Sequence, residues 1–198
     1  MGRKRKDTKT KILELSAILF AEKGKNSVGI REIATKASVS LNTIMYHFTS
    51  KENLYLEAVK HILANGIGFD EIFSDYQESS AKNFREIMKS IFSEAVKPKH
   101  KTFINMLSKI TFSRECSLNS LICTYMKETE SYFTGFFDQA GLKTGKDEIS
   151  FLLSVFWTQL LYHAGTGSIS VLTCEGGNSH VYAADGVADI FISKLGLE

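Results

Sequence analysis

The sequence predicts an all-α protein of about nine helices, with an N-terminal three-helix helix-turn-helix domain followed by a larger helical domain. Every strong hydrophobic periodicity along the chain has the spacing of a helix. The 198 residues include only one proline, and proline interrupts helices and punctuates strand-and-turn folds. Long helices joined by short connections are therefore the expected architecture.

The N-terminal part of the chain is predicted to form three helices, over residues 8–24, 30–37 and 41–47. Apolar side chains recur every three or four residues through the first of them and stop at Gly24, which favours a helix end there. The other two helices are short and are separated by residues 38–40. Two brief helices joined by a tight turn form a helix-turn-helix, whose second helix can lie in the major groove of DNA.

A fourth helix is predicted over residues 51–65. Ser50 is a good N-cap for this helix, and Glu52 suits the positive end of the helix dipole. We expect the helix to connect two domains, which cover residues 1–50 and 51–198.

The larger domain is predicted to contain five further helices, over residues 80–96, 101–113, 117–140, 147–164 and 180–195. The helix over 147–164 is apolar nearly all round and must be buried on two sides. The last helix carries small residues that permit close helix approach. A self-complementary interface between two copies needs these features, so we expect a homodimer formed through 147–164 and 180–195. The alternative is a monomer in which both helices belong to the core.

The second helix of the predicted helix-turn-helix directs Ile44 inward and leaves polar and small side chains on its outer face. Amide and hydroxyl groups such as those of Asn42 and Thr43 can hydrogen-bond base edges, and Leu41 can contact a thymine methyl group. Phenol, imidazole and ammonium groups suit phosphate oxygens. The outward set is Ser40, Leu41, Asn42, Thr43, Tyr46 and His47, and Lys51 beyond the helix also suits phosphate contact. Any one of these side chains could instead be an ordinary solvated or packing residue.

The charge of the chain changes sign along its length. Residues 1–51 carry 11 Lys/Arg and 4 Asp/Glu, a balance of +7, whereas residues 52–198 carry 13 and 18, a balance of −5. A basic head on an acidic body is typical of a nucleic-acid-binding module joined to a part that does not touch nucleic acid. The basic residues 3–6 could add phosphate or minor-groove contacts. A solvated surface that is merely lopsided is the alternative.

No apolar run reaches about 18 residues, so we expect no membrane span. The chain begins with basic residues and lacks the apolar core of a signal peptide. Its three cysteines, Cys116, Cys123 and Cys174, form neither a paired framework nor a CxxC motif. A cytoplasmic protein with free thiols is the expectation.

Several blocks of the N-terminal region together resemble a known family. They are TKILE at 10–14, LFAEKG at 19–24, IREIA at 30–34, ASVS at 37–40 and YHFTSKENL at 46–54. In order and spacing they are similar to the DNA-binding domain of TetR-type (tetracycline-repressor-like) transcriptional regulators, over about residues 8–60. Three positions depart from the family pattern. Met45 stands where a tyrosine is common, Ser38 replaces a turn glycine, and residues 25–26 occupy a place where an aromatic residue is frequent.

The resemblance implies a ligand-responsive transcriptional repressor that binds a palindromic operator in double-stranded DNA as a dimer. It implies release by a small molecule and adds Arg31 to the positions that touch DNA. It also implies a ligand pocket in the larger domain, and the aromatic and sulfur-containing candidates suggest an apolar or aromatic effector. These candidates are Met88, Phe92, Phe103, Met106, Tyr125, Tyr132, Phe133, Phe136, Trp157 and His163. Each of them could equally be plain core.

Three other functions compete with this one. A ligand-independent DNA-binding structural or division factor of the same fold is the main alternative. An enzyme would need a catalytic pair such as Cys116 with His100 or His163, but cysteines in apolar helices are usually inert, and we predict no enzyme and no cofactor. The histidines and cysteines lack metal-ligand spacing, so no metal site is expected. Sequence-specific operator binding that a small molecule abolishes would separate these possibilities.

Overall fold

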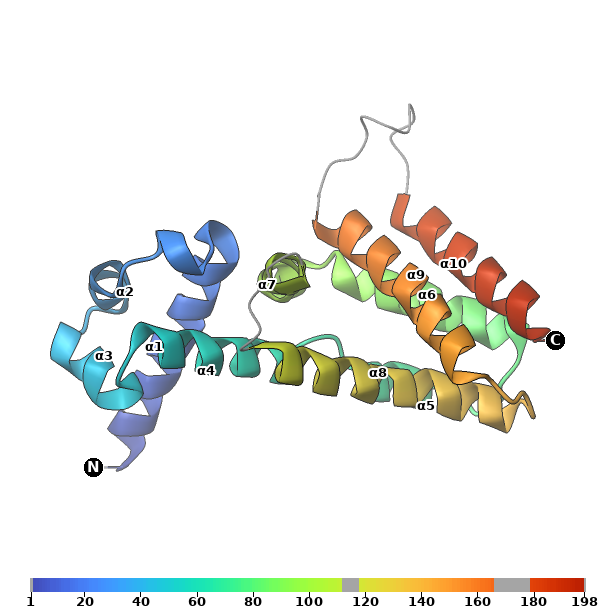
Figure 1. The fold of residues 1–198 in the computed structure, drawn as a ribbon, viewed down its shortest axis with the longest axis horizontal. Helices are drawn as coiled ribbons and strands as arrows, with labels where there is room; N and C mark the ends of the chain where they lie inside the picture. The colour runs from blue at the N-terminus through green and yellow to red at the C-terminus, as the bar shows by residue number, and fades with distance from the viewer. Residues whose placement is uncertain (1, 112–117, 166–178, 198) are drawn as a thin grey trace. The chain divides into compact units, whose positions relative to one another are not determined.

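The computed structural model describes residues 2–111, 118–165 and 179–197, and these residues form ten α-helices and two short 3-10 helices without a strand (Figure 1). The predicted all-α fold class is confirmed. The helices group into two compact units. One contains Met1–Gly66 with Asn105–Asn119, and the other contains Ile67–Ile104 with Ser120–Glu198.

The first unit is built from the N-terminal helices α1 (Gly2–Lys23), η1 (Lys25–Ser27), α2 (Ile30–Ala37), α3 (Leu41–Phe48) and α4 (Lys51–Ala64). The last three lie within one residue of their predicted ranges, whereas α1 begins six residues earlier than expected. Helix α1 packs against both α2 and α4. The rings of Phe20 on α1 and Tyr55 on α4 meet edge to face with centroids 5.1 Å apart. The helix predicted as a connection therefore packs within the first unit, which extends to Gly66.

The second unit contains α5 (Phe69–Ser74), α6 (Ala81–Ala95), η2 (Pro98–His100), α8 (Asn119–Gln139), α9 (Lys146–Gly165) and α10 (Ser179–Leu195). Helix α7 (Lys101–Thr111) belongs to this unit as far as Ile104 and to the first unit from Asn105. Helix α5 has no predicted counterpart, because six residues are too few to display a helical period. The predicted glycine- and serine-rich connection at 165–179 lies mostly outside the described residues.

Aromatic rings fill the core of the second unit. Phe133 on α8 is completely buried. Its ring meets Phe73 of α5, Phe84 of α6, Phe156 of α9 and Phe191 of α10, with centroid distances of 5.1–6.2 Å. One side chain thus touches four helices, and offset and edge-to-face ring contacts add to the hydrophobic stabilisation.

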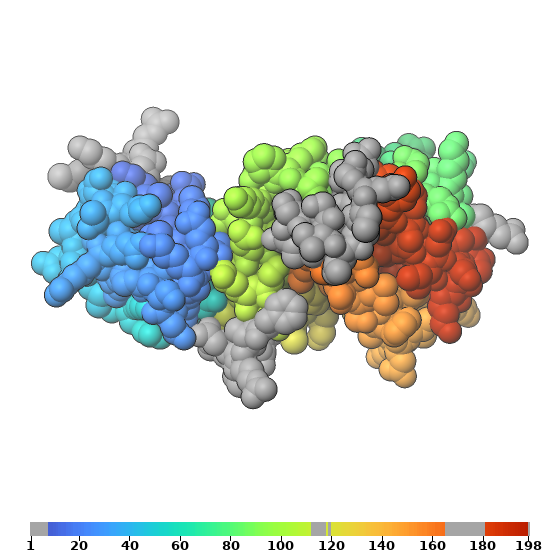
Figure 2. Space-filling model, turned by 90° about the horizontal axis from the view of Figure 1, so that it is seen from above, coloured from blue at the N-terminus to red at the C-terminus, as the bar shows by residue number. Residues whose placement is uncertain are grey.

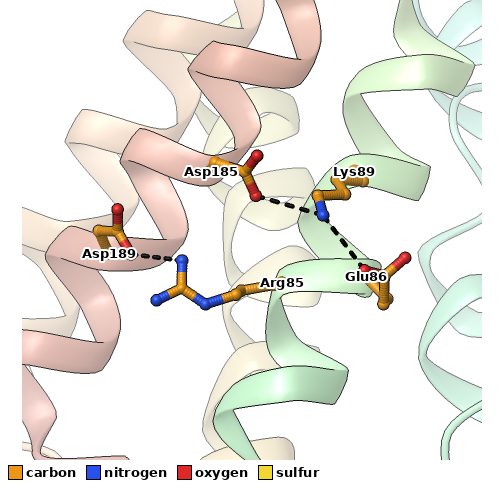
Figure 3. Close-up of polar contacts among 5 residues, drawn as sticks. All are labelled: Arg85, Glu86, Lys89, Asp185 and Asp189. Carbon is orange, nitrogen blue, oxygen red and sulfur yellow. Dashed lines mark hydrogen bonds and ion pairs between the residues drawn. The ribbon is translucent and has the colours of Figure 1, made fainter.

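Two ion pairs join α6 to α10, which pack side by side (Figure 3). Arg85 pairs with Asp189, and Lys89 Nζ lies 3.4 Å from Asp185 and 3.2 Å from Glu86. The two cations are four residues apart on α6 and their partners are four apart on α10, so both pairs form in a single register. Because all these groups are partly exposed, the pairs fix the register of the two helices more than they stabilise the fold.

The corner between α6 and α7 is organised around Glu94. Its carboxylate contacts Lys97 Nζ, lies 2.9 Å from Lys99 Nζ and lies 3.3 Å from His100 Nε2. Hydrogen bonds from the two lysines lower the pKa of Glu94 to about 2. Burial lowers the pKa of His100, and the nearby Lys99 charge acts in the same direction. This corner is therefore held by a carboxylate that stays ionised.

Candidate nucleic-acid interface

The first helix of the helix-turn-helix begins and ends as the sequence predicts. Gly29 is the N-cap of α2, and Ala34 and Ala37 are buried on its inner face. The helix ends at Ser38, whose N–H donates to the Thr35 carbonyl at 3.1 Å. Ser38 has φ 56° and ψ 44°, in the left-handed region. This conformation reverses the chain within three residues and places α3 across α2.

We expect Ser38→Gly to raise the unfolding free energy of the first unit by about 1 kcal/mol. A residue with a Cβ atom is strained at positive φ, by about 1–2 kcal/mol, and the greater freedom of glycine in the unfolded chain offsets part of the gain. Urea unfolding followed by circular dichroism measures the change. Ser38→Ala is the control. It should have little effect, since the exposed hydroxyl is not the cause of the strain, and equal effects of the two variants would contradict this account.

Helix α3 is capped by a reciprocal serine–threonine contact. The Ser40 hydroxyl accepts from the Thr43 N–H at 3.1 Å, and the two side-chain oxygens are 2.8 Å apart. This N-cap satisfies one of the amides left free at a helix start. Ile44 and Phe48 are buried on the inner face of α3. The two predicted DNA-contacting hydroxyls therefore also hold the start of the helix.

The outer face of α3 presents side chains to solvent. Tyr46 is 65% exposed, and Leu41 and Asn42 are exposed as well. Met45 is also exposed on this helix, and the predicted contact set does not include it. His47 is half-buried, with its ring centroid 5.2 Å from Tyr46 and 6.0 Å from the buried Phe48. It lies less fully outward than the sequence suggested.

The junction of α3 and α4 is held by Thr49, Ser50 and the side-chain amide of Asn53. Thr49 has φ 58°, an uncommon conformation for a β-branched residue. The Ser50 hydroxyl accepts from the Asn53 N–H at 3.1 Å, and Asn53 Nδ2 donates to the Phe48 carbonyl at 2.9 Å. Asn53 was not singled out from the sequence, because the capping-box signal at this position is Glu or Gln. The arrangement places Lys51 in the first turn of α4 beside the end of α3.

The cations of this surface fall into two groups. Lys23 pairs with Glu32, and Lys60 pairs with Glu57. Arg31 and Lys51 have no acidic partner in the part of the chain that the structure describes. An unpaired cation can neutralise a DNA phosphate without first breaking an ion pair. The basic residues 3–6 lie in α1, but their side chains are outside the described set.

Most of the predicted pocket residues lie in the second unit, but the structure does not unite all of them. Seven are buried there, namely Met88, Phe92, Phe103, Tyr125, Phe133, Phe136 and Trp157. Tyr132 and His163 are half-buried, and Met106 belongs to the first unit. Ring contacts link Phe103 to Tyr125 and Tyr125 to Trp157, with centroids 5.8 and 5.9 Å apart.

Only some of the residues named for an enzyme or a metal site lie in the described part of the chain. Cys116 and Cys174 lie outside the described residues, and Cys123 is exposed. His100 contacts Glu94. Where the chain is described, no three His, Cys, Asp or Glu side chains gather as metal ligands would. Among the described helices, none is long and apolar enough to span a membrane.

Helices α2 and α3 are short and are joined at Ser38, whose backbone is left-handed, and α3 exposes polar side chains. These features define a helix-turn-helix DNA-binding protein with a helical body. Residues 12–58 match the model of the bacterial regulatory proteins of the tetR family. The N-terminal part of the chain thus carries the DNA-binding domain of TetR-family regulators, and the resemblance noted in its sequence is confirmed.

Proteins of known name and structure resemble a larger share of the chain. The HTH-type transcriptional repressor KstR2 of Rhodococcus jostii (strain RHA1) is 25% identical over 181 residues, covering 83% of this chain and 84% of that protein. A transcriptional regulator from Rhodococcus sp. Rha1 superposes with a TM-score of 0.72 at 14% identity, covering 96% of this chain and 98% of its own. AibR, in complex with isovaleryl coenzyme A and operator DNA, superposes with a TM-score of 0.66 at 18% identity, covering 92% and 97%. At these identities the two structures support the fold.

Proposed function

We propose that the protein is a ligand-responsive transcriptional repressor. It binds a palindromic operator as a homodimer through α2 and α3, and a small apolar or aromatic effector releases it. The observation that carries this proposal is the exposed face of α3, flanked by Arg31 and Lys51, two cations without acidic partners in the described structure. Such a face meets both needs of DNA recognition, base contacts and phosphate neutralisation. The protein would act in the cytoplasm, where bacterial operator DNA lies.

The relatives support the regulatory part of the proposal. KstR2 is named a repressor, and the AibR complex holds both an acyl coenzyme A and operator DNA. By analogy, we assign DNA binding to residues 1–50 and ligand binding and dimerisation to residues 51–198, with α4 between these two activities. A structural or division factor of the same fold would bind DNA without responding to any small molecule. Effector-dependent release separates the two functions.

The proposed DNA contacts fall into two kinds. Leu41, Asn42 and Thr43 lie in the first turn of α3, the part of a recognition helix that usually meets base edges. The second kind would contact phosphates, or bases at the edge of the site, around that turn. It consists of Arg31, Ser40, Tyr46, His47 and Lys51. The first kind determines which sequence is bound, and the second determines how tightly any duplex is bound.

The dimer is proposed to form through α9 and α10, which run side by side (Figures 1 and 2). Within one chain, α9 buries only one of the two apolar sides expected from its sequence, since Phe151 is 57% exposed. On α10, Tyr182 is 78% exposed and Ile190 is also exposed. A Cβ atom added at Gly186, between them on the same side of α10, would meet no atom within 4 Å. A second copy could cover these apolar side chains and approach closely at the glycine.

We expect Asn42→Ala and Lys51→Ala to weaken DNA binding in different ways. The operator is first selected by the full-length protein from a pool of random duplexes. Asn42→Ala should cost about 1–3 kcal/mol of binding free energy through one base pair of each half-site. It should not alter the effect of substitutions at the other base pairs of the operator. Lys51→Ala should weaken binding to every duplex alike and reduce the dependence of log K on log salt concentration by about 1 for each subunit. Fluorescence anisotropy at two salt concentrations measures both effects.

Lys60→Ala is the matched control for the charge. It removes a lysine from the same helix, but that lysine already pairs with Glu57 at 2.9 Å. Its affinity and salt dependence should stay close to those of the unmodified protein. Identical behaviour of the Asn42 and Lys51 variants would overturn the division of roles, and selection of no preferred sequence would overturn the proposed function itself.

A further inference from the structure

Besides His100 Nδ1, two polar atoms in the second unit are enclosed by protein without a hydrogen-bond partner among the described residues. They are the hydroxyl of Tyr125 on α8 and Nε1 of Trp157 on α9. The side chains are only 9% and 7% exposed, and their ring centroids are 5.9 Å apart. An unsatisfied buried polar group is costly, and native interiors satisfy nearly all of theirs. Because the two rings are neighbours, a single partner placed between them could satisfy both atoms.

The surroundings of these two atoms are aromatic. Phe103 lies 5.8 Å from Tyr125, and Phe69 and Phe156 lie 6.0 and 5.2 Å from Trp157, measured between ring centroids. Apolar walls with a small number of polar groups are typical of sites that bind small organic molecules. The walls would hold an apolar body, and the two polar atoms would fix its orientation.

The chemistry of the two atoms specifies their partner. An indole N–H can only donate a hydrogen bond. Burial raises the pKa of the Tyr125 hydroxyl, and the Glu128 and Tyr132 charges act in the same direction. The hydroxyl therefore keeps its proton and can donate as well. Both atoms need an acceptor, and a carbonyl oxygen has two lone pairs with which to accept from both.

A neutral acceptor fits this place better than a carboxylate. Transfer of an unpaired negative charge into an aromatic interior is strongly unfavourable. The Glu128 carboxylate, whose field disfavours ionisation of Tyr125, would disfavour a second anion for the same reason. The oxygen of a ketone, ester, thioester or amide carries no such cost.

We propose that Tyr125 and Trp157 form a subsite for the neutral carbonyl group of an apolar or aromatic small molecule. This inference rests on the proposed function, in which the second unit binds an effector, and it adds the chemical group that the effector must carry. The two side chains position the ligand through its oxygen, while the surrounding rings bind its hydrocarbon part.

The test uses the fact that Trp157 is the only tryptophan of the chain, so a ¹H–¹⁵N spectrum of the full-length protein contains a single indole signal. The probes are acetophenone, ethylbenzene and benzoate, which share a phenyl ring and differ in the acceptor. Acetophenone should move the indole proton downfield as its N–H becomes hydrogen-bonded. Ethylbenzene should bind about 10- to 100-fold more weakly without a downfield shift, because it can form neither of the two proposed hydrogen bonds. Benzoate should bind more weakly than acetophenone.

A matched pair of variants tests the hydroxyl. Tyr125→Phe should reduce acetophenone affinity about 3- to 10-fold and leave ethylbenzene affinity unchanged. Without ligand, its melting temperature should stay the same or rise, because the variant removes a buried hydroxyl that has no partner. Tyr76→Phe removes a hydroxyl from a half-buried tyrosine between α5 and α6 of the same unit and should change neither quantity.

Two results would overturn the inference. One is the absence of any indole shift with acetophenone up to its solubility limit. The other is a lower melting temperature of Tyr125→Phe with the preference for acetophenone over ethylbenzene retained, which would mean that the hydroxyl has a structural partner. Neither measurement contains DNA. Operator binding by the same protein is scored separately, so failure of the subsite and failure of the proposed function are distinguishable.

Discussion

Replacing Phe151 with lysine is expected to convert the protein from a dimer to a monomer and to weaken operator binding by about 10²- to 10⁴-fold. Phe151 is 57% exposed within one chain, and the proposed interface would bury it. A lysine there would lose hydration without gaining a partner. Two recognition helices reach successive major grooves, about 34 Å apart, only when two copies are held together. A monomer would therefore retain the affinity of a single half-site.

Sedimentation equilibrium gives the oligomeric state of the Phe151 variant, and operator titration gives its affinity. Ser131→Lys, which adds the same charge at an exposed position of α8, is the control and should remain dimeric. Circular dichroism should show the same helix content for both variants. A Phe151→Lys protein that stays dimeric and binds the operator normally would rule out dimerisation through this part of α9.

Phe133→Ala should lower the unfolding free energy by about 3–5 kcal/mol, the usual cost of truncating a fully buried phenylalanine. The ring is completely buried and contacts phenylalanines of four helices, namely α5, α6, α9 and α10. Truncation would remove all of these contacts at once and leave a cavity. Closing that cavity would require four separate helices to move. The loss should exceed that of any single substitution on the DNA-binding face.

Urea unfolding at a fixed protein concentration measures the effect of the Phe133 variant, because dimerisation contributes to apparent stability. Phe133→Leu is the companion variant. It keeps a large apolar side chain in place and should cost less than half as much. A loss below about 1 kcal/mol for Phe133→Ala would show that this position is not the centre of the core.

The helix-turn-helix could be predicted almost completely from the chain itself. Its signals are local: Gly29 and Ser50 as N-caps, a three-residue turn, and a buried residue every three or four positions. Because each signal acts within a few residues, the observed ranges of α2, α3 and α4 differ from the predicted ones by at most one residue. The left-handed backbone at Ser38 could also be expected, because glycine, the residue that adopts positive φ most readily, is common at this position in the family.

Other features depend on contacts between distant residues. Helix α5 is too short to show a period, and it is held by rings of α8 and α9 that pack on Phe69 and Phe73. The assignment of Met106 to the first unit, apart from the other predicted pocket residues, likewise follows from packing and not from sequence spacing.

The amino-acid sequence alone determined the helical class, the resemblance of the N-terminal region to TetR DNA-binding domains and the position of that motif, because periodicity, caps and charge act within short stretches of chain. The tertiary structure decided which apolar side chains face each other and which are left outside. It placed Tyr125 beside Trp157 without acceptors in the described structure and left Phe151 exposed. Both results depend on how α8, α9 and α10 pack, and packing is a property of surfaces that only the folded chain brings together.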